Sequence, residues 1–345
     1  MPGPKYRVMP LTQDDHALWD DTIEHADRGT VFHRTSWLRS FDRKVALVGC
    51  YSEAGTLVGG IPLSYQRLAG MTIVRPPFLT PYLGPLVFSK NDEGKYHRAL
   101  TIERDVIVAL LDWMTGFANF IRIPLSPNHN DVQPFRQMGF NHADIEYTYV
   151  VRLDEMDRVW KEMDQDKRRK IKKGYGEGLS CAVSDDLDEF LPLWDHSLRS
   201  HNRRPVPMRA WEVRSWYEAL STENRTKMLQ VRDAAGRIHA GAVLVWDRKR
   251  AYYLLSGMNR DVASHNAMAL LLWECMRFCN EEIHIPEFDF DGSDIPSVEV
   301  FFRGFGGNLV PRYTVTYERS FLLGPVRRTM KLISAVSTAL KAWSW

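Results

Sequence analysis

The chain has 345 residues, which is longer than one ordinary domain and favours two domains of similar size. Its 44% hydrophobic and 26% charged residues are typical of a soluble globular protein with a substantial core. Because 45 Lys and Arg residues nearly balance 43 Asp and Glu residues, the composition excludes a protein that binds polyanions with its whole surface, and any phosphate contact has to come from a local patch.

The N-terminus and the cysteines predict the compartment. The opening run MPGPKYR lacks the apolar core of a signal peptide, and no stretch reaches the length of a membrane span. Cys50, Cys181, Cys275 and Cys279 include no CxxC pair, and no His, Cys and carboxylate cluster has metal-ligand spacing. We therefore expect a cytoplasmic protein with reduced cysteines and no bound metal.

The first half of the chain predicts a hairpin, a long helix, a short helix and a strand, in this order. An apolar strand over residues 45–51 leads to small turn residues at 53–55 and a second strand. Residues 98–117 form an apolar helix, and residues 132–140 a short amphipathic helix that ends in Gly-Phe. The Tyr-rich segment 147–151 predicts the strand that follows.

The second half repeats this order. Residues 235–244 resemble residues 54–63, and residues 298–305 resemble the short helix at 132–140. One apolar helix, over residues 266–280, lies between these two anchors. The repeat predicts an α/β (mixed α+β) fold of two duplicated domains, each with a mixed, mostly antiparallel sheet flanked by helices.

The repeat places the first domain in residues 1–155 and the second in residues 156–322. A C-terminal amphipathic helix over residues 323–345 completes the chain, with apolar residues at helical spacing and basic residues beside them. This pattern suits a helix that lies on a membrane surface or in a partner's groove. Packing on the chain's own domains explains the pattern equally well.

Two motifs in the second half carry a family resemblance: FDFDGS at residues 288–293 and FFRGFGG at residues 301–307. With the order of elements, they resemble the acetyltransferase (GNAT) fold present twice and, more specifically, Fem-type peptidoglycan aminoacyltransferases and their exopolysaccharide-associated relatives. The resemblance covers residues 30–320. It implies transfer of an acyl or aminoacyl group to an amine of a cell-envelope or polysaccharide precursor, in the cytoplasm or at the inner face of the membrane.

The donor stays open at this point. Acetyl-CoA-using members begin their central helix with a Gly-rich loop that holds pyrophosphate, whereas residues 259–267 of this chain contain no glycine. The donor is either an acyl-CoA or an aminoacyl-tRNA, so tRNA is a candidate partner beside a lipid-linked precursor. An acetyl-CoA-dependent N-acetyltransferase of an amino sugar or small amine is one alternative, and a non-catalytic GNAT-fold protein of envelope biogenesis is the second.

The two motifs supply the candidate catalytic residues. Strand alternation puts Asp289 and Asp291 on the face opposite the phenylalanines, where we expect a cleft; Asp289 could accept a proton from the amine, and Asp291 could bind substrate or cap the turn. By resemblance, Phe302 and Arg303 take the place of a Phe-Lys pair that stabilises the reacting acyl group. Glu299 shares a helix face with Arg303 and either binds substrate or forms an ion pair. We expect Asp289 and Arg303 to converge on one hollow.

Three further features allow two readings each. Arg203 and Arg204 lie in a Pro-containing loop, where they could bind a substrate carboxylate or phosphate or stay solvated. Tyr252 and Tyr253 face opposite sides of a strand, so Tyr253 is a candidate for substrate contact, with core packing as the alternative. Residues 167–173 include six basic residues, which could contact an RNA backbone or a lipid-linked diphosphate, or form a solvated face.

Overall fold

The structure, a computed structural model, describes residues 5–88, 96–200, 210–262, 264–292 and 295–319. Arg203, Arg204 and the expected helix over residues 323–345 lie outside these ranges. Within them the chain forms two compact units: unit 1 holds the residues before 147 together with residues 311–319, and unit 2 holds residues 147–310. No helix of the described ranges is long and apolar enough to cross a membrane.

Unit 1 is a sheet with one long helix packed on it. The strands follow the order β1 (Tyr6–Pro10), β2 (Lys44–Ser52), β3 (Leu57–Leu68), β4 (Met71–Val74), β6 (Phe120–Pro124) and β13 (Asn308–Glu318), and β5 (Leu86–Val87) pairs with β3. β4 and β6 run parallel, and the other neighbouring strands described in this unit run antiparallel. The helices are α1 (His16–His25), α2 (Thr35–Leu38), α3 (Tyr96–Phe117) and α4 (Gln133–Gln137). α3 buries Val106, Leu110 and Met114 at helical spacing against the sheet, which explains the expected apolar helix.

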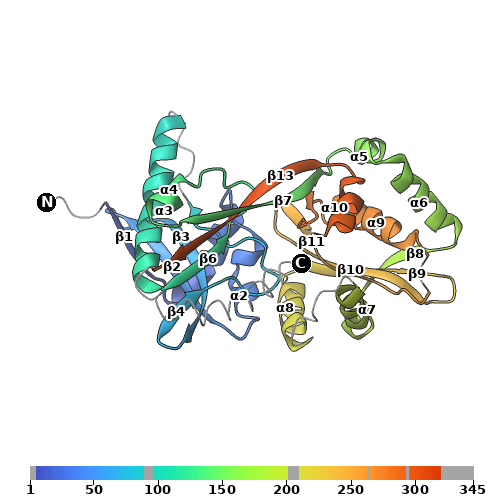
Figure 1. The fold of residues 1–345 in the computed structure, drawn as a ribbon, viewed down its shortest axis with the longest axis horizontal. Helices are drawn as coiled ribbons and strands as arrows, with labels where there is room; N and C mark the ends of the chain where they lie inside the picture. Colours follow the sequence, from blue (N-terminus) through green and yellow to red (C-terminus); the bar gives the residue numbers. More distant parts are fainter. Residues whose placement is uncertain (1–4, 89–95, 201–209, 263, 293–294, 320–345) are drawn as a thin grey trace. The chain divides into compact units, whose positions relative to one another are not determined.

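Unit 2 has the same kind of sheet with helices on both faces. Its strands follow the order β7 (His142–Arg152), β12 (Glu287–Asp289), β11 (Arg250–Met258), β10 (Ile238–Trp246), β9 (Thr226–Arg232) and β8 (Ser180–Ser184). β11 and β12 run parallel, and the other neighbouring strands among the described residues of this unit run antiparallel. The helices are α5 (Met156–Glu162), α6 (Gln165–Gly176), α7 (Leu187–Ser200), α8 (Ala210–Thr222), α9 (Ala267–Glu281) and α10 (Pro296–Arg303). Figure 1 places α5, α6, α9 and α10 on one face and α7 and α8 on the other.

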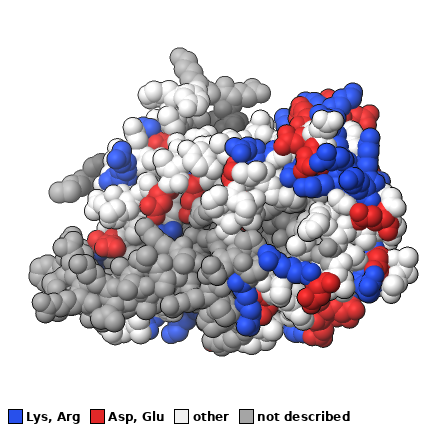
Figure 2. Space-filling view, turned by 45° about the vertical axis from the view of Figure 1, so that its right-hand side comes forward, with Lys and Arg blue, Asp and Glu red and all other residues white. Residues whose placement is uncertain are grey.

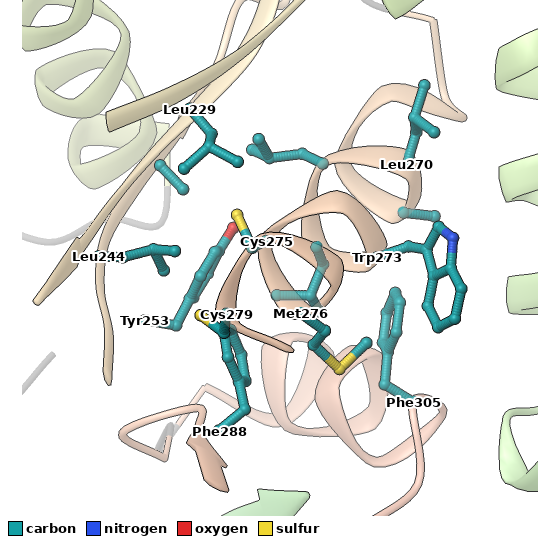
Figure 3. Packing of buried hydrophobic residues seen from close by; sticks show 14 of the residues in the cluster. Leu229, Leu244, Tyr253, Leu270, Trp273, Cys275, Met276, Cys279, Phe288 and Phe305 are labelled. Carbon is teal, nitrogen blue, oxygen red and sulfur yellow. The ribbon is translucent and has the colours of Figure 1, made fainter. Parts of the chain in front are cut away.

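The duplicated order of elements is confirmed. The two hairpins are β2–β3 and β9–β10, the two central helices are α3 and α9, and the two short helices are α4 and α10. The core of unit 2 lies between α9 and the sheet, where Tyr253 and Phe288 of the strands meet Cys275 and Met276 of the helix (Figure 3). Each unit is therefore a mixed sheet flanked by helices.

The last strand of each half lies in the other half's unit. β7 belongs to the first half of the chain and pairs with β12, whereas β13 belongs to the second half and pairs with β6. The compact units therefore divide the chain inside β7 and β13, while the expected ranges 1–155 and 156–322 follow the order of the chain. The repeat shows the order of strands but not the edge to which the last strand of each half adds.

Candidate active site

The two motifs form β12 with its following turn and α10 with its following loop. Phe288 and Phe290 point into the core of unit 2, where the ring centroid of Phe290 lies 5.0 Å from that of Phe302 on α10. Strand alternation therefore places Asp289 on the opposite face of the sheet, as expected. Phe302 is buried, and its ring anchors α10 to β12.

Asp289 is fully buried at the end of β12. Its Oδ1 accepts hydrogen bonds from the Thr148 hydroxyl at 2.6 Å and from the Asp291 amide at 2.8 Å. Nη1 of Arg250 lies 3.4 Å from its Oδ2, and Nη2 of the same guanidinium lies 2.6 Å from Glu287. A desolvated carboxylate needs this many partners, and they tie together β7, β11 and β12. We call Thr148, Arg250, Glu287 and Asp289 the buried network.

The two adjacent tyrosines of β11 lie on opposite faces of the sheet, and both are buried. Tyr252 lies on the face of the buried network and donates a hydrogen bond to Asp247 at 2.8 Å; burial raises the pKa of Asp247. Tyr253 lies on the core face, with its ring centroid 6.0 Å from that of Phe302. Only 4% of Tyr253 is exposed, so core packing, the alternative to substrate contact, describes its position.

In the described part of the turn after β12, residues 290–292, the one carboxylate is buried. Asp291 is buried and has a φ of 61°, in the left-handed region, where a short polar side chain is tolerated. Gly292 follows with a φ of 73°, and a Cβ there would lie 2.3 Å from the carbonyl oxygen of Tyr147. The position of Asp291 therefore fits a turn residue better than a substrate ligand.

The outer face of α10 carries a second and exposed set of polar groups. The Tyr149 hydroxyl donates to Glu299 Oε1 at 2.6 Å, and this oxygen lies 3.8 Å from Nε of Arg303. The Arg303 side chain is 60% exposed and that of Glu299 is 33% exposed. Burial, followed by the bond to Glu299, raises the pKa of the Tyr149 hydroxyl. We call Tyr149, Glu299 and Arg303 the α10 row; it can meet a ligand from solvent.

Asp289 and Arg303 do not converge on one hollow. Phe288 and Phe290 point from β12 toward Phe302 on α10, so Asp289, between them, points to the other face of the sheet. Asp289 is 0% exposed, whereas most of the Arg303 side chain is in solvent. The prediction that the two side chains share one hollow is therefore wrong. Strand alternation gives the face of Asp289 correctly, but side chains of the protein itself cover that face.

The glycines of the FFRGFGG motif make room for the protein's own chain. A Cβ on Gly304 would lie 2.6 Å from Cε of Lys167, and a Cβ on Gly307, where φ is 91°, would lie 2.9 Å from the Val150 carbonyl oxygen. Lys167 is only 8% exposed, and its Nζ lies 4.6 Å from the ring centroid of Phe301. Burial lowers the pKa of this amine.

Lys167 and Tyr149 contact the motif helix although sequence reasoning assigned neither to the site. Residues 167, 171 and 174 are buried at helical spacing in α6, and this pattern was the available signal that Lys167 points inward. For Tyr149 the sequence indicated only a strand. The structure thus joins Tyr149 to the two charged residues expected on α10.

A carboxylate of the chain itself lies beside the residues that precede α9. Glu177, which follows α6, accepts hydrogen bonds from Asn266 Nδ2 at 2.7 Å and from the Ser264 hydroxyl at 2.5 Å. The Ser264 hydroxyl in turn accepts from the Asn266 amide at 3.1 Å, and the Ser264 amide donates to His239 Nδ1 at 3.1 Å. Helix N-termini attract anions, and here Glu177 supplies the negative charge.

Comparison with known proteins gives a family for part of the chain. Residues 161–296 match the family described as acetyltransferase (GNAT) domain. This range contains β8 to β12, α9 and the FDFDGS motif. A search of curated protein sequences found no significant match.

Solved structures with the same fold extend the likeness to both units. FemX has a TM-score of 0.65 at 12% identity, over 89% of this chain and 96% of FemX. The C-terminal domain of a putative lysylphosphatidylglycerol synthetase from Agrobacterium fabrum has a TM-score of 0.57 at 17% identity, over 89% of this chain and 93% of that domain. A tandem GNAT protein from the clavulanic acid biosynthesis pathway has a TM-score of 0.50 at 15% identity, over 91% and 98% of the two chains. The resemblance to GNAT and Fem-type proteins is confirmed for the fold.

Proposed function

We propose that the chain, which has a tandem GNAT fold like that of FemX and matches an acetyltransferase (GNAT) domain over residues 161–296, transfers an acyl or aminoacyl group to an amine. The acceptor is an amine of a cell-envelope or polysaccharide precursor. The donor is an aminoacyl ester of tRNA rather than a CoA thioester. With a lipid-linked acceptor, the reaction takes place at the inner face of the membrane.

The observation that carries the choice of donor is the position of Glu177. GNAT proteins that use acetyl-CoA hold its pyrophosphate at the start of the helix that corresponds to α9. Here the Glu177 carboxylate accepts hydrogen bonds from Ser264 and Asn266 at that place. A pyrophosphate bound there would meet a like charge, whereas an aminoacyl ester carries no such group at its reacting end. The likeness to a lysylphosphatidylglycerol synthetase fold supports an aminoacyl donor.

The α10 row offers the groups that the reaction needs. The amine nitrogen bonds to the acyl carbon, and the bond from this carbon to the donor oxygen breaks. Glu299 accepts the proton that the amine loses and returns it to the departing oxygen. Arg303 donates to the acyl oxygen while negative charge develops on it. Glu299 takes the role first expected of Asp289 because its carboxylate is accessible and that of Asp289 is buried.

A donor screen tests this function. The purified protein is incubated with amine-bearing envelope precursors and with acetyl-CoA, longer acyl-CoAs or aminoacyl-tRNA, and products are read by their mass. We expect a product from aminoacyl-tRNA and none from the CoA thioesters. A product from acetyl-CoA alone would overturn the choice of donor.

One alternative has an observation in its favour. The matched family is described as an acetyltransferase domain, which favours an acetyl-CoA-dependent N-acetyltransferase of an amino sugar or small amine. The same screen separates the two functions. If folded protein yields no product from any donor, and Arg303→Ala leaves function in cells intact, the protein is a non-catalytic binding protein instead.

A further inference from the structure

Helices α5 and α6 gather positive charge on the outside of unit 2. Figure 2 shows Lys and Arg concentrated at the upper right, over the end of unit 2 where Figure 1 places these helices. The basic run 167–173 forms the middle of α6. Lys167 and Ile171 turn to the core, whereas Arg169, Lys172 and Lys173 are exposed and Arg168 is half-buried.

Pairing neutralises only part of this charge. Asp166 pairs with Arg169 at 2.7 Å and with Lys170 at 2.9 Å, one helical turn away. Apart from the buried Lys167, four cations of α5 and α6 have no carboxylate within 4.0 Å in the described part of the chain: Lys161, Arg168, Lys172 and Lys173. We call the three that lie on α6, namely Arg168, Lys172 and Lys173, the α6 cations. Unpaired cations leave a local positive field on a chain whose net charge is only +2.

The spacing of the α6 cations suits an extended anion. Arg168 and Lys172 stand one turn apart, about 6 Å along the helix axis, and Lys173 follows directly. A row of separate cations fits a chain of single phosphate charges better than it fits one compact anion. Aromatic rings lie beside the row: Lys172 Nζ is 5.9 Å from the ring centroid of Trp160, and Tyr175 is 45% exposed.

The same surface offers little to a lipid bilayer. Membrane-surface helices place large apolar side chains next to their cations and bury them in the lipid. Among the described residues of α5 and α6, Tyr175 is the only exposed large hydrophobic residue. Phosphate contacts need no such residues, so a nucleic-acid backbone is the partner that the observations favour.

We propose that the α6 cations are the docking surface for the phosphate backbone of an RNA. This inference deepens the proposed function and rests on it in one respect, since an aminoacyl-tRNA donor is an RNA that the protein must hold. The inner face of α6 contributes Lys167, which packs on Phe301 of the motif helix. One helix therefore carries the RNA surface on its outer side and supports α10 with its inner side.

Fluorescence anisotropy with a labelled RNA hairpin tests the docking surface. The triple variant Arg168→Ala, Lys172→Ala, Lys173→Ala should bind at least about tenfold more weakly than the wild type, and the slope of log affinity against log salt should fall by about 3. The matched control removes three exposed cations of unit 1: Lys44→Ala, Arg67→Ala and Arg98→Ala. The affinity of this control for the hairpin should stay within about twofold of the wild-type value, because the removed cations lie outside the docking surface.

Three results would overturn the proposal. The first is that the wild type does not bind the hairpin, and the second is that the two triple variants lose equal affinity for it. The third is that the α6 variant loses affinity for phosphatidylglycerol vesicles but not for the hairpin. The last result would identify a membrane surface instead. The assay needs no turnover, so its failure leaves the donor screen as a separate test of transfer. Conversely, RNA binding at α6 without transfer from any donor would contradict the proposed function and leave the docking surface in place.

Discussion

The buried network and the α10 row come from neighbouring parts of the sequence, yet they lie in opposite environments. Asp289 is surrounded by Thr148, Arg250 and the Asp291 amide and has no exposed surface, whereas Glu299 and Arg303 form a 3.8 Å pair in partial contact with solvent. A buried charge that loses its partner is costly, whereas an exposed ion pair contributes about 0–1 kcal/mol. The buried network therefore supports stability, whereas the α10 row is available to a ligand. Substitutions should therefore separate stability from transfer.

The largest expected effect is on stability, at Asp289. Asp289→Ala leaves Arg250 with one partner fewer and leaves the Thr148 hydroxyl without its acceptor, so the free energy of unfolding should fall by about 3–5 kcal/mol. Urea unfolding measures the change. The control is Asp154→Ala, which breaks an exposed pair with Arg152 and should change the free energy of unfolding by less than about 0.5 kcal/mol. If Asp289→Ala unfolded at the same urea concentration as the wild type, the buried network would not differ from the α10 row in its contribution to stability.

Arg303→Ala should slow transfer and leave stability almost unchanged. Loss of one charge-stabilising donor should slow transfer by about 100-fold, while the free energy of unfolding changes by less than about 0.5 kcal/mol. Single-turnover transfer and urea unfolding on the same preparation measure the two quantities. Arg199→Ala, which breaks an exposed pair with Asp195 at the same spacing on α7, should keep the wild-type rate. Equal rates in both variants would exclude the α10 row from the reaction.

His129 in unit 1 tests the effect of burial on a single titratable side chain, because only 1% of it is exposed. Burial lowers its pKa from 6.5 to about 3, and its Nε2 has no hydrogen-bond partner among the described residues. Below pH 6.5 the unfolded chain binds a proton that the folded chain excludes, so stability falls as the pH drops toward 3. Between pH 7 and pH 5 this group should cost the wild type about 2 kcal/mol.

His129→Leu should remove that part of the pH dependence, with unfolding followed in urea at pH 7 and pH 5. The exposed His142→Leu is the control and should retain the wild-type dependence. If the free energy of unfolding depended on pH identically in the wild type and in His129→Leu, burial of this ring would not control its protonation.

Tyr149→Phe should have the smallest effect. It removes the 2.6 Å bond that holds the Glu299 carboxylate, and a hydrogen bond of this kind contributes about 1 kcal/mol. Transfer should slow by about fivefold, with a greater effect on the rate constant than on binding of the acceptor. Lowered stability with an unchanged rate would mean that Tyr149 only supports the fold.

Much of the fold could be predicted because helices, hairpins and their order depend on local patterns. Small residues at residues 53–55 and 233–236 marked both hairpins, and the apolar periodicity of α3 and α9 marked both central helices. The pairing of β7 with β12 and of β13 with β6 could not be predicted, because an edge strand's partner depends on distant segments.

The site was predictable to the same extent. Alternation placed Asp289 opposite the phenylalanines, and helical spacing paired Glu299 with Arg303. What covers Asp289 could not be predicted, because Thr148 is 141 residues away in the sequence and Arg250 is 39 residues away. Tyr149 reaches Glu299 across 150 residues, so local spacing gave no sign of it.

The most direct test of the central claim is a calorimetric titration of acetyl-CoA into the wild type and into Glu177→Ala. With Glu177 at the start of α9, the wild type should show no binding at about 1 mM ligand, and Glu177→Ala should bind more tightly because the helix N-terminus loses its negative charge. Saturable binding of acetyl-CoA by the wild type with a Kd below about 1 mM would contradict the account, because the diphosphate would then bind where Glu177 is proposed to exclude it.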